Sequence, residues 1–371
     1  MATVINKNSN KKNRKRIFYL DALRALAIIT VIAVHLADKT WFLNTGKMVI
    51  GSLNWYVTDM LNFRLGVDLF LMLAGALSLG RDWDIKTFLG KRIPRIVGPF
   101  IFWGLILSVF LISCSYFFPD IVHVIKSFNL ASISKYIIKA FLAKSLGFGP
   151  YWFFWMILGT YLIMPIFNKW LLHSDLKEAE YFLCFWIITT IFTFTLNREF
   201  PIALTYFTSP IGLVILGYYL RHTERKIFKS IYTPIILMLI GCISSLTVSY
   251  LLSSPSHIVT FGRYSIFMII IVSGVFLLFR NLSNIDLNIN FFSNPKGVFK
   301  RSVFSIAKYS YGIYLIHFPI LTVMICFLRK CTDLNFKPIV LISFVGIILI
   351  CWGIMALLNR VPYINRIIGA K

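Results

Sequence analysis

The residues best suited to chemistry in this chain are ionisable side chains inside long apolar runs. The first such run carries Asp21, Arg24 and His35. Arg24 and His35 are eleven residues apart, so on an α-helix they share one face, with directions about 20° apart and an axial separation of about 16 Å. Asp21 precedes Arg24 by three residues and can pair with it. This face combines a group that binds anions with an imidazole that can take up a proton near neutral pH.

These three residues also have a purely structural interpretation. Arg24 could be held by Asp21 as a structural ion pair, and His35 could donate to a backbone carbonyl inside a helix bundle. A charged residue at mid-bilayer costs about 2.5–3.5 kcal/mol on insertion scales, so such residues are usually paired and functional. Their common face favours two ends of a substrate path.

A second basic group lies in the sequence KRIPRI, where Arg92 and Arg95 flank Pro94. Proline suits the first turn of a helix, so we expect a span to start here with both guanidinium groups at its mouth. Arginine makes planar, multidentate contacts with phosphate. The pair is a candidate for binding either a phosphorylated substrate or the phosphates of lipids.

Weaker candidates are polar or aromatic residues in other apolar runs: Asp68, Tyr151, Trp152 and His317. Asp68 could orient His35 or pair with Arg64. Aromatic residues at the end of a span form an interface belt, although such faces also bind sugars and Tyr or Trp could donate to an oxyanion. The histidine lies two residues before Pro319, which fits either a core residue of a kinked helix or a functional one.

Composition identifies the elements that must position these residues. Hydrophobic residues make up 58% of the 371 residues and charged residues only 14%, against about 45–50% and about 25% in soluble domains. This excludes soluble globular, disordered and disulfide-scaffold proteins. The net charge is +24, but the basic residues lie mostly in short loops between apolar runs. That distribution indicates membrane lipid headgroups as partners and not nucleic acid.

The pattern of apolar runs predicts an all-α, polytopic bundle of transmembrane helices with about ten spans. The apolar runs are 17–37, 65–80, 96–118, 150–168, 181–197, 200–220, 231–253, 264–280, 307–328 and 338–359. With a cytoplasmic N-terminus, 24 of the 38 Lys and Arg residues fall in the tail, the even-numbered loops and the C-terminus. The positive-inside rule therefore predicts that both termini are cytoplasmic.

We expect residues 1–16 to be a basic cytoplasmic tail and 17–371 to be a single membrane domain. Segment 119–150 is the longest predicted outer loop, and within it Lys135 and Lys139 fall on one helical face and Tyr136 and Ala140 largely on another. This pattern fits an interfacial helix lying on the membrane, and it equally fits a loop that packs on the bundle.

Several motifs are missing from the sequence. There is no CxxC, no Cys/His metal spacing, no Walker A sequence, no GxSxG and no HExxH. We therefore expect no metal ion and no bound cofactor, and neither an ATP motor nor a serine hydrolase.

The residues singled out resemble the motifs of the acyltransferase-3 membrane acyltransferases. YLDALRALAIITVIAVHL is similar to the family's first helix, in which a basic residue, ten residues and a histidine match Arg24 and His35. Arg92 and Arg95 match its RxxR motif at the cytoplasmic end of the third span. GVDLFLMLAGAL resembles its second-span segment, with Ala74 where serine is common, and YSYGIYLIHFP resembles a late segment. The chain resembles stand-alone members, such as O-antigen and enterobacterial common antigen O-acetyltransferases, more than members with a fused esterase-like domain.

The resemblance implies an O-acyltransferase of the bacterial cytoplasmic (inner) membrane. Acetyl-CoA, or another acyl-CoA, would be the donor in the cytoplasm, and a lipid-linked or surface polysaccharide would be the acceptor. Arg24, Arg92 and Arg95 would bind the acyl donor. His35 would act as general base on a sugar hydroxyl in direct transfer. Alternatively, it would carry the acyl group itself as an acyl-histidine.

Two other classes remain open at the level of sequence. A transporter, such as a glycan flippase, would also use ten spans, aromatic faces and a basic interior. A structural subunit of a glycan synthesis complex would bind no acyl donor. The sequence leaves open the acyl group, the acceptor hydroxyl and the oligomeric state.

Overall fold

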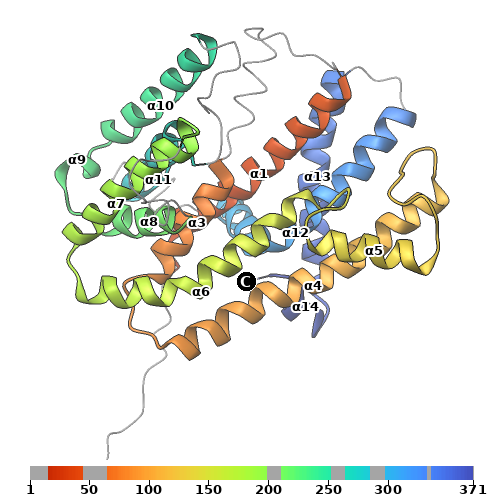
Figure 1. The fold of residues 1–371 in the computed structure, drawn as a ribbon, viewed down its shortest axis with the longest axis horizontal. Helices are drawn as coiled ribbons and strands as arrows, with labels where there is room; N and C mark the ends of the chain where they lie inside the picture. Colours follow the sequence, from red (N-terminus) through yellow and green to blue (C-terminus); the bar gives the residue numbers. More distant parts are fainter. Residues whose placement is uncertain are drawn as a thin grey trace, which may run out of the picture.

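The computed structural model describes residues 16–44, 65–198, 210–251, 264–284, 297–331 and 336–370. Within these ranges the chain forms helices and turns, with no β-strand (Figure 1). Six of the helices are long and apolar enough to cross a membrane, and two shorter apolar helices accompany them. The protein is an all-α, multi-pass membrane protein, as its composition predicts. Most of the basic tail 1–16 lies outside the described residues, as does Arg64.

The long helices are α1 (Phe18–Asn44), α4 (Ile85–Phe117), α6 (Trp152–His173), α10 (Tyr232–Leu251), α12 (Gly297–Cys331) and α13 (Phe336–Leu358). The shorter helices are α3 (Leu65–Ser78), α5 (Leu130–Phe141), α7 (Leu176–Thr190), α8 (Ile211–His222), α9 (Lys226–Lys229), α11 (Ile266–Leu282) and α14 (Ile364–Ile367). A 3-10 turn, η1 (Gly149–Tyr151), precedes α6, and a π turn, η2 (Ile191–Thr195), extends α7. Each of the ten predicted apolar runs overlaps one of these helices.

Helix α1 lies in the middle of the bundle, where it contacts α3, α11, α12 and α13 (Figure 1). Small residues allow this close packing. A Cβ atom at Gly66 of α3 would lie 2.5 Å from the carbonyl oxygen of Ala27 on α1. In a bilayer, helices associate through such small-residue contacts because lipid gives no hydrophobic driving force between them. The helix that carries Arg24 and His35 is therefore held on several sides.

The crossing of α3 and α8 is closer still. A Cβ atom at Gly75 would lie 1.7 Å from the carbonyl oxygen of Val214, and one at Gly217 would lie 2.1 Å from that of Met72. The two backbones touch, so no side chain fits between them at either glycine. This contact fixes α3, which forms one wall of the cavity described below.

Helix α4 begins eleven residues before the predicted apolar run, at Ile85 and not near 96. The Asp84 carboxylate caps it by accepting hydrogen bonds from the backbone N–H groups of Lys86 and Thr87, each 2.9 Å long. This cap satisfies the first turn. The prediction that Pro94 lies in the first turn is therefore wrong, because Pro94 is inside the helix.

The predicted outer segment 119–150 contains the amphipathic helix α5. Tyr136 and Ala140 are buried on one side, and Lys135 and Lys139 are exposed. The helix contacts α4, and the Tyr136 hydroxyl donates to the carbonyl oxygen of Leu146 at 2.8 Å. The segment thus contains a helix whose buried side packs on α4.

Candidate active site

At the start of α1, the Asp21 carboxylate forms ion pairs with two guanidinium groups. Asp21 is buried and accepts hydrogen bonds from Arg16 at 2.6 Å and from Arg24 at 3.2 Å. The predicted Asp21–Arg24 pair is confirmed, with Arg16 as an additional partner. Arg24 is about one fifth exposed, so part of its guanidinium group stays open to a ligand.

Arg92 reaches the same region from α4. Its Nη2 donates to the Ser78 hydroxyl at 2.9 Å, and its guanidinium carbon lies 5.7 Å from the Phe88 ring centre and 5.9 Å from that of Tyr161. No carboxylate lies within ion-pair distance of Arg92 among the residues that the structure describes. Cation–π contacts stabilise the charge but leave donors for an anion.

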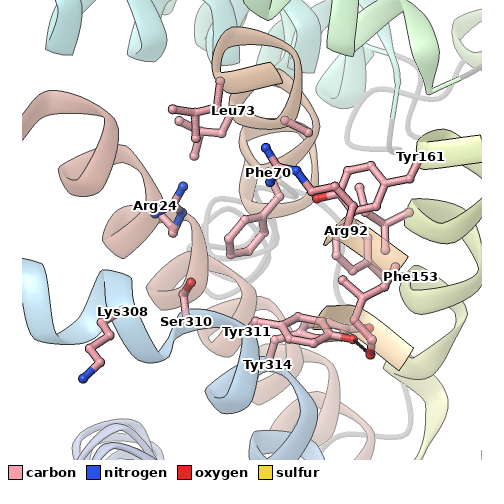
Figure 2. A pocket seen from close by; sticks show the side chains of 14 residues that line it. Arg24, Phe70, Leu73, Arg92, Phe153, Tyr161, Lys308, Ser310, Tyr311 and Tyr314 are labelled. Atoms are coloured by element: carbon pink, nitrogen blue, oxygen red, sulfur yellow. Dashed lines mark hydrogen bonds between the residues drawn. The ribbon is translucent and has the colours of Figure 1, made fainter. Parts of the chain in front are cut away.

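A cavity separates the two arginines (Figure 2). It is lined by α1, α3, α4, α6 and α12, and the space free of protein atoms there, including the part open to solvent, is about 730 Å³. Arg24 enters from one side and Arg92 from the other, while Tyr311 and Tyr314 lie along a third side. Lys308 also lines the cavity, but its ammonium group points away from the middle.

The balance of charge around the cavity favours an anion. Arg24 is repelled by the positive charges of Arg16 and Arg92, and Asp21 is the carboxylate that opposes them. Like charges repel strongly where the surroundings are poor in water. A phosphate placed between Arg24 and Arg92 would relieve this repulsion. We call the region of Arg24, Arg92 and Tyr161 the arginine end of the bundle.

The other predicted donor-binding residue, Arg95, has a different environment. It is exposed on α4 and is not among the residues that line the cavity. Arg92 and Arg95 are three residues apart, yet only the first lines the cavity. The structure therefore brings Arg24 and Arg92 together and leaves Arg95 outside their cavity.

His35 lies on α1 beyond the cavity, about 16 Å along the helix axis from Arg24. Its ring is 5.3 Å from the ring of His317 and 5.1 Å from that of Phe318, measured between ring centres. His35 is partly buried, whereas His317 is fully buried. We call His35, His317 and Phe318 the histidine region.

Tyr314 connects the arginine end with the histidine region. It lines the cavity, and its ring centre is 5.9 Å from that of His317 and 5.1 Å from that of Phe153. Its hydroxyl donates to the backbone carbonyl of Pro150. Neither histidine lines the cavity. Tyr314 therefore lines the cavity and also lies next to a residue of the histidine region.

The weaker sequence candidates have separate positions. Tyr151 is fully buried, and its hydroxyl has no protein hydrogen-bond partner among the described residues. It lies within electrostatic range of Tyr311, a cavity residue. Trp152 is partly buried at the start of α6, and Asp68 is fully buried in α3.

Sequence reasoning missed the aromatic walls of the site. Tyr161, Tyr311 and Tyr314 line the cavity, and none was selected as a site residue. Tyr311 and Tyr314 are both in YSYGIYLIHFP, three residues apart and thus on one helical face. The same segment contains His317. The shared helical face of Tyr311 and Tyr314 near this histidine is the feature of the sequence that could have identified them as site residues.

These features define an integral membrane helical bundle with an anion-attracting cavity at one end and a pair of histidines beyond it. The model of the acyltransferase-3 family, described as an acyltransferase domain, matches residues 17–356. The chain therefore belongs to this family and is a membrane acyltransferase. No curated protein and no solved structure matches the chain.

Proposed function

We propose that the protein is an O-acyltransferase that moves an acyl group, acetyl in the first instance, from acetyl-CoA to a sugar hydroxyl of a lipid-linked or surface polysaccharide. The observation that carries the proposal is the cavity between Arg24 and Arg92, on the same helix as His35. Arginine binds phosphate through several hydrogen bonds at once. The phosphates of coenzyme A fit this preference, and the pantetheine arm is long enough for the 16 Å or so along α1.

The chemistry follows from the order of these groups along the path. The donor phosphates bind at Arg24 and Arg92, with Arg95 at the entrance, and the thioester lies near His35. His35 takes the proton of the sugar hydroxyl while that oxygen attacks the thioester carbonyl carbon. The carbon–sulfur bond then breaks, and the coenzyme A thiolate takes the proton from His35. A positioned base of this kind contributes about 10²–10⁴ in rate.

The tetrahedral intermediate needs hydrogen-bond donors for its oxyanion. Tyr151 and Trp152 are the candidates, and the Tyr151 hydroxyl is buried without a protein partner among the described residues. Asp21 orients Arg24 by accepting its hydrogen bond. Asp68 is a secondary candidate for orienting His35. His317 is treated separately below.

The location follows from the donor. Acetyl-CoA is made in the cytoplasm, so the arginine end faces the cytoplasm together with both termini. The histidine region lies toward the outer side, where the glycan acceptor would arrive. The protein is placed in the bacterial cytoplasmic membrane.

The test measures the O-acyl content of surface glycans in cells that lack the gene, complemented with wild type, His35→Ala or His173→Ala. His173 is exposed at the end of α6, where it contacts the carbonyl of Lys169, so it is a matched control. We expect wild type and His173→Ala to restore an alkali-labile ester and His35→Ala to leave it absent at equal membrane levels. Normal acylation with His35→Ala would refute the base, and a change only in glycan amount would favour transport.

A further inference from the structure

His317 on α12 lies next to His35 on α1. Their ring centres are 5.3 Å apart with 34° between the ring planes. His317 is fully buried, and His35 is partly exposed. Of the two imidazoles, His35 is therefore the one that a substrate can reach.

Backbone contacts determine which nitrogen of His317 carries the proton. Its Nδ1 is 2.7 Å from the carbonyl oxygen of Tyr314 and 3.2 Å from that of Ile313. A carbonyl can only accept, so Nδ1 is the donor. In the neutral ring Nε2 then carries the lone pair.

The Nε2 atom of His317 is buried and has no hydrogen-bond partner among the residues that the structure describes. A buried acceptor without a partner costs free energy, so such groups usually have a functional reason. Among the described residues, the rings within 6.3 Å of His317, measured between centres, are Tyr314, His35 and Phe318. The Tyr314 hydroxyl is already used on Pro150, and phenylalanine has no donor. The remaining ring that can offer an N–H is His35.

We propose that His317 is a positioning residue for His35. When substrate is bound, its Nε2 accepts a hydrogen bond from one ring N–H of His35, which leaves the lone pair of the other His35 nitrogen directed at the acceptor hydroxyl. This inference rests on the proposed function, because it gives His35 a partner in that reaction.

The proton steps balance without any further reactant. His35 takes the hydroxyl proton on the nitrogen that faces the substrate and becomes an imidazolium, while the N–H of its other nitrogen stays hydrogen-bonded to His317. The proton leaves to the coenzyme A thiolate once the carbon–sulfur bond breaks. His317 neither gains nor loses a proton, and it stabilises the imidazolium by accepting a charge-assisted hydrogen bond.

Two amide substitutions at this position separate the two nitrogens. In His317→Asn the amide N–H can replace Nδ1 and keep the backbone contacts, but no acceptor reaches the Nε2 position. In His317→Gln the longer side chain can place its carbonyl oxygen at that position. His222→Gln is the control, because its Nδ1 lies 2.8 Å from the carbonyl of Tyr218 four residues earlier, and no histidine ring lies against it among the described residues.

The experiment measures kcat, KM for acetyl-CoA and thermal stability of the full-length variants beside wild type and His35→Ala. We expect His317→Asn to lower kcat about 10- to 100-fold with KM and melting temperature close to wild type. His317→Gln should recover most of that loss, and His222→Gln should match wild type.

The outcomes separate this inference from the proposed function. If wild type transfers acyl groups, His35→Ala does not, and His317→Asn retains full kcat, the positioning role alone is refuted. Equal losses in the Asn and Gln variants, or a change confined to melting temperature, would refute it too and make His317 structural. An inactive wild type would refute both proposals.

Discussion

The arginine end and the histidine region differ in charge and in exposure. At the arginine end, Arg24 and Arg92 line an accessible cavity, and Asp21 is the carboxylate that pairs with Arg24 and Arg16 among the described residues. In the histidine region, two imidazoles are surrounded by aromatic rings, and one of them is fully buried. An excess of positive charge suits binding of phosphates, and the imidazoles of the histidine region suit proton transfer. Under the proposed function, the donor would therefore bind and react at different positions along α1.

The largest expected effect comes from a substitution that removes the scaffold of both regions. Gly75→Ala places a methyl group where the Val214 carbonyl oxygen lies 1.7 Å away, so α3 and α8 must separate at a cost of about 1–3 kcal/mol or more. We expect a lower melting temperature and several-fold less folded protein in detergent. Gly159→Ala on α6 meets no atom within 4 Å and should leave stability unchanged or slightly higher. Equal behaviour of the two variants would contradict the close crossing.

The next effect is confined to the arginine end. Arg92→Ala removes a guanidinium group from the cavity wall, and we expect KM for acetyl-CoA to rise about 10- to 100-fold with a small change in kcat. Lys91→Ala, which removes the same charge from an exposed neighbouring position, should change KM little. Arg95→Ala should have an intermediate effect, because Arg95 is exposed outside the cavity. A loss of kcat alone in Arg92→Ala would break the division between the two regions.

The smallest effect lies away from both regions, at the polar start of α7. Glu180 accepts hydrogen bonds from Arg225 and from Tyr219, each 2.6 Å long, and these lower its pKa to about 2. Because the folded pKa is depressed, its contribution to stability is present above the usual carboxylate pKa and is lost as pH falls toward 2. Both side chains are partly exposed, so the contribution is at most about 1 kcal/mol.

Thermal unfolding of Glu180→Gln tests this contribution across pH. We expect a melting temperature slightly below wild type at pH 7 and a difference that shrinks as pH falls from about 4.5 toward 2. Acyl transfer near neutral pH should be unaffected. A difference that grows on acidification would have the wrong sign for a depressed pKa.

The sequence predicted well where a pattern is local. The ten apolar runs overlap ten helices, and the spacing of Asp21 and Arg24 predicted their ion pair. Helical spacing alone places Arg24 and His35 on one face of one helix, and α1 is continuous across both. Such features depend on residues close in the chain, whose geometry the helix itself determines.

Contacts between distant segments could not be predicted in this way. Tyr314 joins the cavity to His317, and Arg92 reaches Ser78 of α3. Arg280, in the last turn of α11, is buried and donates to the carbonyl oxygens of Leu220 and Phe228. It satisfies the ends of α8 and α9, which become its neighbours only after folding.

The start of α4 shows a second feature that hydropathy does not predict, the residue at which a helix begins. Hydropathy begins the span near 96 because the residues from Ile85 onward are partly charged. The Asp84 cap and the following amphipathic turns extend the helix beyond the apolar run. Hydropathy detects the part of a helix that lipid requires, whereas capping decides where the helix starts.

The most direct test of the division between the two regions is equilibrium binding of coenzyme A, without an acyl group, to the purified protein. Wild type, Arg92→Ala and His35→Ala would be compared in the same detergent. We expect Kd to rise about tenfold or more in Arg92→Ala and to stay near the wild-type value in His35→Ala. The opposite pattern, weak binding with His35→Ala and normal binding with Arg92→Ala, would contradict separate sites for binding and chemistry.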